Sequence, residues 1–328
     1  MPYVRAFALS AIFGVAVLSV LALYGDLPRL AQTARAFPAA LLVPVLLLTS
    51  TNYLLRWVKW RYYLRLVDAA EVTRTDSVLV FLSGFAMGLT PGKVGEIIKP
   101  YLLRERYGIP ISRTTPIPFA ERLSDGIAML LLGSAGAVVY GTGAAAFAAI
   151  VVLAIAALVV VRSARLRTLL LGIAVRLPVL GPRADALHEL FLSAAALVAW
   201  RPLAFAVALG VLSWGCEAVA FFLVLAGLGQ PLTPTLLLQA TFALASAGLF
   251  GSASLLPGGL GVAEASLTGY LQLGVGLARP DAVYATLVIR LCTLWFGIAL
   301  GTLALLAAVG RRAAIEVGET AVETLPSA

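Results

Sequence analysis

The 328-residue chain is 61% hydrophobic, is 12% charged and carries a formal net charge of +8. Soluble domains contain about 25% charged residues, so this composition excludes an ordinary soluble globular protein. In a chain this apolar, an excess of arginine and lysine reflects cytoplasmic loops and anionic headgroups rather than nucleic acid. We therefore expect a single integral membrane domain over residues 1–328, with an anionic lipid surface and no nucleic acid among its partners.

Two cysteines and one histidine limit the metal and nucleophile chemistry. Cys216 and Cys292 lie within apolar segments and are predicted to be packing residues. His188 lies in the most hydrophilic stretch and is predicted to be exposed, which argues against a multi-histidine metal site. We therefore expect neither a bound metal nor a cofactor.

Apolar runs of membrane-spanning length, about 20 residues each, recur along the chain. The first is too long for the core of a signal peptide and has no small-residue cleavage site, so we expect it to be retained. The second ends in RWVKWR (56–61), a basic and aromatic sequence typical of a cytoplasmic boundary. The predicted crossings are residues 4–24, 39–60, 117–140, 144–161, 203–228 and 282–309.

Arginines recur among apolar residues in the segment that joins the two halves of the chain. This pattern predicts amphipathic helices along the cytosolic membrane surface over residues 163–202. Counting crossings outward from this connection places both termini in the cytoplasm, and the basic residues on that side support the assignment. We expect a multi-pass protein of the cell membrane.

Two further regions, residues 76–106 and 236–274, are each interrupted by a Pro-Gly sequence. In the first, residues 77–89 make about 20 Å of helix, too short for a hydrocarbon core of about 30 Å. Thr90 is expected to cap a second short helix that begins at Pro91. Both regions are predicted to be hairpins with a broken helix, although the first arm of the second region is long enough to cross.

Small residues surround both interruptions. Glycines at Gly84, Gly88 and Gly92 recur every four residues, as do Ala243, Ala247 and Gly251, so both faces are expected to allow close helix packing. Bare backbone at a helix N-terminus can bind an anion, and a lipid phosphate is the anion that fits a membrane location. The residues predicted to form the breaks are Pro91, Gly92, Gly95, Pro257, Gly258, Gly259 and Gly261.

The same order of features occurs in residues 39–140 and 203–309: a span, a broken hairpin followed by a glutamate, and a span with an arginine. Glu96 precedes Arg122 by 26 residues, and Glu264 precedes Arg290 by 26 residues. The first hairpin is expected to enter from the cytosol and the second from outside. The fold class predicted is therefore an all-α polytopic bundle with an inverted repeat, an architecture typical of alternating-access transporters.

Ionisable side chains at bilayer depth cost about 2.5 to 3.5 kcal/mol on insertion scales, so each one is a functional candidate that needs a partner. Arg122 can pair with a neighbouring acid or with one from the hairpin. Two alternatives stay open: the cluster around Arg122 could be solvated near the cytosolic interface, and Glu217 with Arg290 could be a structural ion pair. The candidates are Lys93, Glu96, Glu121, Arg122, Asp125, Glu217, Glu264 and Arg290.

Five stretches carry a resemblance to a known family: RWVKWRYYL (56–64), GLTPGKVGEIIKPYLL (88–103), FAERLSD (119–125), LLPGGLGVAEASL (255–267) and LVIR (287–290). Over residues 4–310 the sequence resembles the lysylphosphatidylglycerol synthase transmembrane region, or flippase-like, family. The resemblance implies translocation of a polar-headed lipid. The positions that match are Arg56, Pro91, Gly92, Lys93, Gly95, Glu96, Glu121, Arg122, Asp125, Pro257, Gly258, Gly261, Glu264 and Arg290.

The sequence departs from the two-domain, lipid-modifying members of that family, because it reaches Ala328 without a cytosolic aminoacyltransferase domain. We therefore expect a transporter of a lipid with a phosphate-containing headgroup and not an enzyme, with a separate lipid-modifying enzyme as a possible partner. One alternative is an intramembrane polyprenyl-phosphate glycosyltransferase that uses Asp125 and Glu121 as acid/base or metal-binding groups. The other is a transporter of small solutes or ions.

Overall fold

A computed structural model describes residues 2–90, 95–140, 144–175 and 184–308. Over these residues the chain is helical and contains no strand. The helices, in chain order, are α1 (Pro2–Tyr24), α2 (Leu27–Ala36), α3 (Leu42–Leu66), α4 (Arg74–Ala86), α5 (Ile98–Tyr107), α6 (Ile111–Thr114), α7 (Pro116–Tyr140), α8 (Ala144–Arg162), α9 (Ala164–Val175), α10 (Ala184–Leu197), α11 (Trp200–Gly227), α12 (Pro234–Ala253), α13 (Val262–Tyr270) and α14 (Arg279–Arg290).

Five helical segments among the described residues are long and apolar enough to cross a membrane: Ala39–Leu66, Ile111–Val139, Trp200–Gly227, Pro234–Ala253 and Arg279–Ala308. Four of them correspond to predicted crossings. The fifth is the first arm of the second hairpin. The remaining two predicted crossings, residues 4–24 and 144–161, are helical and belong to pairs bent by 91° and 73°. The predicted all-α polytopic bundle is therefore confirmed, whereas the inverted repeat stays a prediction.

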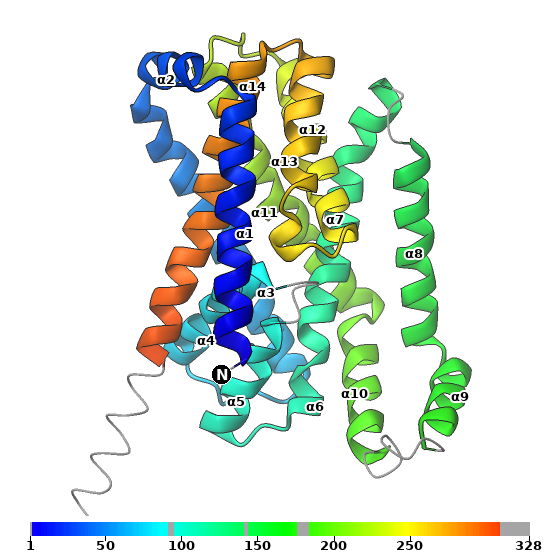
Figure 1. The fold of residues 1–328 in the computed structure, drawn as a ribbon. Coiled ribbons are helices and arrows are strands. Elements are labelled where there is room, and N and C mark those ends of the chain that lie inside the picture. Colours follow the sequence, from blue (N-terminus) through cyan, green and yellow to red (C-terminus); the bar gives the residue numbers. More distant parts are fainter. Residues whose placement is uncertain (1, 91–94, 141–143, 176–183, 309–328) are drawn as a thin grey trace, which may run out of the picture.

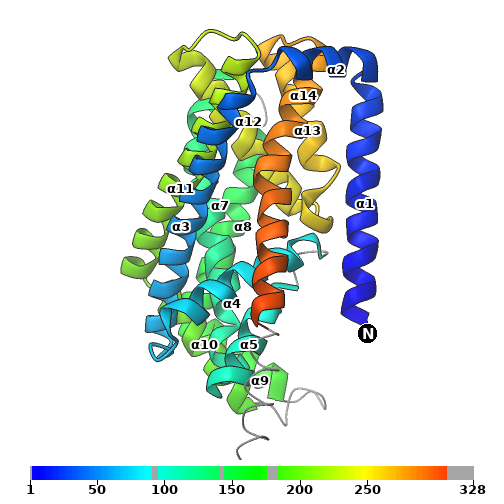
Figure 2. The ribbon, with the colours of Figure 1, turned by 90° about the vertical axis from the view of Figure 1, so that its left-hand side faces the viewer.

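The two broken hairpins enter the bundle from opposite ends. Figure 1 shows α4 and α5 at the lower end, near the N-terminus, and α12 and α13 at the upper end, near α2. Figure 2, turned by 90°, shows the same separation, with α14 at the upper end and the continuation of the same helix to Ala308 reaching the lower end. Each hairpin reaches toward the middle of the bundle, so its break lies at depth.

The first hairpin has two helical arms. Its first arm is α4, which the Thr73 hydroxyl caps by accepting a hydrogen bond from the Asp76 N–H, followed by a 3₁₀ turn, η2 (Met87–Leu89). In the second arm, the α-helix α5 begins at Ile98, and the predicted helix start at Pro91 lies outside the described residues. The Thr90 hydroxyl accepts a hydrogen bond from the Gly95 N–H at 2.8 Å. Glu96 lies in a 3₁₀ turn directly before α5.

The second hairpin turns on three glycines. Between α12 and α13 the chain forms the short turn η5 (Pro257–Gly259), and Gly258, Gly259 and Gly261 all have positive φ angles, which side chains rarely adopt. A Cβ on Gly259 would lie 3.0 Å from the Gly251 Cα. Gly251, which was expected to allow close helix packing, therefore lets the turn fold back onto α12.

Small residues also permit close helix packing elsewhere, although not always as predicted. A Cβ on Gly301 would lie 2.4 Å from the Ala86 backbone nitrogen, so the lower part of the last helix contacts α4 directly. Gly84 leaves room for a lysine side chain, Lys99, rather than for a helix backbone. Among the described residues, a Cβ on Gly88 would have no neighbouring atom within 4 Å, so Gly88 makes no close helix contact with that part of the chain.

The predicted connection of residues 163–202 contains α9 and α10. The 73° bend between α8 and α9 suits a helix that turns along a surface. By contrast, α10 stands upright in Figure 1 and packs against α6 and α7, so it belongs to the bundle. His188 on α10 is exposed, as predicted, while Cys292 is buried and Cys216 is partly buried.

Candidate functional site

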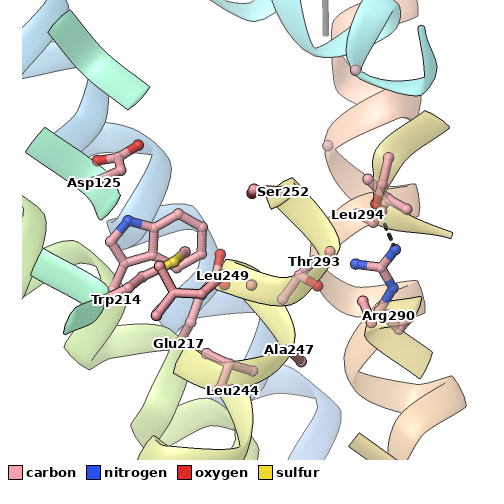
Figure 3. Close-up of a pocket in the computed structure, with 18 of the residues that line it drawn as sticks. Asp125, Trp214, Glu217, Leu244, Ala247, Leu249, Ser252, Arg290, Thr293 and Leu294 are labelled. Carbon is pink, nitrogen blue, oxygen red and sulfur yellow. Dashed lines mark hydrogen bonds between the residues drawn. The ribbon is translucent and has the colours of Figure 1, made fainter. Parts of the chain in front are cut away.

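A cavity of about 370 Å³ lies inside the bundle between the two hairpins. Its walls come from α3, α7, α11, α12 and α14 and from both helix breaks. Figure 3 shows Asp125 and Glu217 on one side of this space and Arg290 on the other. Pockets of this size accommodate small ligands or ligand headgroups. The cavity therefore brings together charged residues from both halves of the chain.

The two breaks meet beside this cavity. Leu89, at the end of η2, is fully buried, and a Cβ on Gly258 would lie 3.1 Å from its Cδ2 atom. Leu89 also packs with Leu260 and Ile298 in a small apolar cluster. The first and second interruptions are thus joined by direct contact at depth, which is the arrangement expected where broken helices build a binding site.

The first charged group of the site is the ion pair between Arg122 on α7 and Glu96 in the first break. Arg122 therefore donates its hydrogen bond to the glutamate of the first hairpin and not to an acid of α7. Lys99 on α5 lies 3.6 Å from the other oxygen of Glu96 and 2.7 Å from Glu121. The pair and the lysine tie the first hairpin to α7.

The second charged group repeats the first with different helices. Arg290 on α14 lies 2.5 Å from Glu264 on α13, and its Nη2 atom donates a hydrogen bond to the Gly258 carbonyl at 3.0 Å. Glu264 in turn accepts a hydrogen bond from the Gly261 N–H at 2.7 Å. Arg290 is therefore bound to the second break through both its side-chain partner and the backbone.

Both ion pairs join residues 26 positions apart in the sequence. In each, a glutamate beside a helix break binds an arginine on the following long helix. The equal spacing noted in the sequence thus corresponds to the same contact made twice, once in each hairpin.

Buried lysines are the part of the site that sequence reasoning missed. Lys59 was assigned to a basic cytoplasmic boundary, but its side chain is buried and forms an ion pair with Asp125. Asn52, Arg56, Lys59 and Tyr63 lie on one face of α3 at helical spacing, and this polar stripe within an apolar span is the signal that could have identified it. A charge held inside a membrane domain needs such a partner.

One alternative was that the cluster around Arg122 is solvated near the cytosolic interface. Glu121 and Asp125 are only 2% and 3% exposed, so these two acids are buried in the protein and not solvated. Asp125 Oδ1 accepts a hydrogen bond from Lys59, whereas its Oδ2 atom, which has no hydrogen-bond partner among the described residues, lies 3.9 Å from Arg56. The second oxygen of this buried carboxylate is therefore within ion-pair distance of Arg56 and makes no hydrogen bond among the described residues.

Arg56 lies between two aromatic rings. Its guanidinium carbon is 5.3 Å from the centre of the Phe85 ring and 5.6 Å from that of Trp214. Arginine packs on aromatic faces in this way while the N–H groups in the plane of its guanidinium stay available as donors. The rings hold Arg56 at the cavity wall, where it lies between the first hairpin and α11.

Glu217 is buried on α11 and lines the cavity. One turn earlier, the Asn52 side chain donates a hydrogen bond to the Ser213 carbonyl at 2.9 Å, which ties α11 to α3 at this depth. Three predicted site residues, Lys93, Pro91 and Gly92, lie outside the described residues. Of the other predicted site residues, those that line the cavity are Arg56, Glu96, Arg122, Asp125, Glu217, Gly258, Gly259 and Arg290, and Glu264 pairs with Arg290. The cavity lining does not include Glu121, Gly95, Pro257 or Gly261.

Arginine, lysine and carboxylate side chains together can bind an anionic group and a cationic or hydroxyl group side by side. A guanidinium binds phosphate through two parallel hydrogen bonds, and it does so most strongly away from bulk water. Among the described residues, the arginines that line the cavity are Arg56, Arg122 and Arg290, and the acids are Glu96, Asp125 and Glu217. Over the described residues, no three His, Cys, Asp or Glu side chains are grouped to hold a metal ion.

A family model with the description lysylphosphatidylglycerol synthase TM region matches residues 7–301. The matched region includes both hairpins, both ion pairs and every residue that lines the cavity. No curated protein and no solved structure matches the chain.

Proposed function

Because the chain belongs to the lysylphosphatidylglycerol synthase TM region family, we propose that it moves a polar-headed lipid between the two leaflets of the cell membrane. The observation that carries this proposal is the charged cavity where the two helix breaks meet. A lipid headgroup is the polar part of a substrate that must cross the hydrocarbon core, and it needs such a lined passage because a charge in hydrocarbon is costly.

The phosphate of the headgroup would bind to arginines that face the cavity. Arg122 and Arg290 are each neutralised by a glutamate, so a phosphate can replace or share that partner without leaving a guanidinium unpaired. Arg56 offers a third guanidinium, already oriented by its two rings. Hydroxyl or ammonium groups of the headgroup would bind to the carboxylates of Asp125 and Glu217.

The acyl chains would stay outside the cavity. Leu255 and Leu256, at the tip of the second hairpin, line the cavity and are also exposed, by 67% and 39%. Such an apolar rim suits the part of a lipid where the headgroup ends and the chains begin. The lipid would then bind with its headgroup inside the protein and its chains in the bilayer.

The test is a leaflet-redistribution assay with purified protein in vesicles. Phosphatidylglycerol and phosphatidylethanolamine with fluorescent acyl chains serve as two probes, and a membrane-impermeant quencher reports how fast each reaches the outer leaflet. Arg122→Ala and Arg290→Ala should slow redistribution at least about tenfold, since each removes a charge-assisted contact. Arg113→Ala is the matched control, because Arg113 pairs with Glu189 outside the cavity.

The same vesicles separate this proposal from the two alternatives. We propose that the protein is not an enzyme, so mass spectra of the extracted lipids should be unchanged after incubation. A new covalent product would favour the intramembrane glycosyltransferase. Redistribution of both probes at the rate of protein-free vesicles would contradict a lipid flippase and favour a transporter of small solutes.

A further inference from the structure

The last long helix contains a π-helical turn at the depth of the cavity. Regular α-helix α14 ends at Arg290, and η7 (Leu291–Trp295) follows with π-helical hydrogen bonds before the helix continues to Ala308. The Phe296 N–H donates to the Leu291 carbonyl, five residues earlier. A π turn amounts to one extra residue inserted into an α-helix and is found mostly at functional sites. Here it lies directly after a charged residue of the cavity.

Tyr53 on α3 binds this turn. Its hydroxyl donates a hydrogen bond to the Thr293 carbonyl at 2.5 Å. Gly297 leaves the space for it, because a Cβ on that residue would lie 2.7 Å from the Tyr53 hydroxyl. The tyrosine ring also packs against Phe85, with ring centres 4.8 Å apart, and lines the cavity. Thus a residue from another helix contacts the backbone that the π turn displaces.

The two parts of the long helix are bound to different hairpins. Above the turn, Arg290 is bound to Glu264 and to the Gly258 carbonyl in the second hairpin. Below it, Gly301 lies against Ala86 of α4, and Arg106 of α5 donates a hydrogen bond to the Ala308 carbonyl. The π turn therefore connects the part of the helix that binds the second hairpin with the part that binds the first hairpin.

We infer that Tyr53 is a positioning residue for Arg290: by binding the π turn, it sets where the guanidinium faces the cavity and how the second break is held. This inference rests on the proposed binding of a phosphate-containing headgroup by Arg290. Without the tyrosine hydroxyl, the Thr293 carbonyl loses its partner from α3 and the turn can shift toward regular α-helix. Arg290 would then rotate away from its two partners in the second hairpin.

A double-mutant cycle in the vesicle assay tests the inference, with the same two fluorescent lipids as probes. Tyr53→Phe removes only the hydroxyl and should slow redistribution about fivefold, the effect expected for one hydrogen bond. Arg290→Lys keeps the charge but loses the fork of donors. In that background Tyr53→Phe should cause no further loss, because coupled residues are not additive. Two independent losses that multiply would overturn the inference.

Tyr62→Phe is the matched control. It removes a tyrosine hydroxyl from the same helix, next to a ring, Phe205, that lies away from the cavity lining. This variant should redistribute both lipids at the wild-type rate. Wild-type protein that redistributes neither probe would contradict the proposed function but leave the positioning role to be decided by the second measurement.

That second measurement is hydrogen–deuterium exchange in lipid nanodiscs, which requires no transport. Tyr53→Phe should increase exchange in peptides that cover residues 289–298 and also in peptides that cover residues 256–264 of the second break. If Tyr53 only packs locally, Tyr53→Phe should increase exchange over residues 289–298 and leave residues 256–264 unchanged. Unchanged exchange over residues 256–264 would therefore overturn the positioning of Arg290, whatever the lipid assay gives.

Discussion

Leu89, at the end of the first broken helix, packs against Gly258 at the second break. The contact joins the two hairpins beside the cavity, and the Gly258 carbonyl is also an acceptor for Arg290. A substitution of Gly258 therefore affects the backbone turn, the contact between the two hairpins and the position of Arg290.

Gly258→Ala should destabilise the protein more than an equivalent change elsewhere. Gly258 has a φ angle of 60°, where a side chain costs about 1 kcal/mol, and the added Cβ would press on Leu89. Thermal unfolding in detergent micelles measures the difference. Gly108→Ala is the control, because Gly108 has a φ angle of 68° and no neighbour within 4 Å of an added Cβ. Equal losses in the two variants would mean that the Leu89 contact has no energetic role.

Removing Lys59 should be more damaging than removing both members of its ion pair. Lys59→Met leaves Asp125 as a buried charge without its lysine partner, which costs about 3 to 5 kcal/mol. Lys59→Met combined with Asp125→Asn removes both charges and should recover most of the folded yield. The measurement is the monodisperse fraction after detergent extraction, followed by thermal unfolding. A double variant as unstable as the single one would show that Lys59 acts through packing and not through charge.

The predicted orientation can be checked with single cysteines at opposite ends of the bundle. The background carries Cys216→Ser and Cys292→Ser, and each test variant adds one cysteine, Leu232→Cys or Arg104→Cys. Leu232 lies between α11 and α12, and Arg104 lies on α5. Both positions are exposed. If the termini are cytoplasmic, a membrane-impermeant maleimide added to intact cells should label the first and not the second. The reverse pattern would invert the orientation without changing the fold.

Acid should loosen the attachment of α10 to α6. A hydrogen bond from Ser112, helped by Arg113, holds the pKa of Glu189 below its usual range. Because the pKa is lowered in the folded state, the stabilisation is present above the unfolded pKa of about 4.3 and is lost as the pH falls through the lowered value. Hydrogen exchange of α10 should therefore increase at acidic pH. Glu189→Gln should remove this pH dependence, and an unaltered profile in that variant would exclude Glu189 as its origin.

Much of the fold followed from local properties of the sequence. Runs of apolar residues located the long helices, because burial in a membrane requires about 20 such residues in succession. Pro-Gly sequences located both interruptions, since proline and glycine both destabilise the interior of a helix. The equal spacing of Glu96–Arg122 and Glu264–Arg290 indicated a repeated arrangement but did not predict the ion pairs. The partner of Arg122 was left open, and the partner suggested for Arg290 was Glu217, whereas the structure pairs Arg290 with Glu264.

Other features depended on which helices pack together. Lys59 lies in a basic stretch that resembles a membrane boundary, and only the approach of α7 shows that it is buried against Asp125. Arg122 could pair with an acid of its own helix or with one of the first hairpin, and only the packing of that hairpin against α7 shows that Glu96 is the partner. In both places contacts between helices, and not the local sequence pattern, decided the partner.

The sequence by itself determined an all-helical membrane protein, its two interruptions and its unusual number of charges at membrane depth, because hydrophobicity and helix breaking act over short stretches of chain. Only the tertiary structure decided that the interruptions touch, that a cavity lies beside them and that Tyr53 binds the π turn after Arg290. These contacts join residues from distant parts of the chain, and the packing of whole helices selects them.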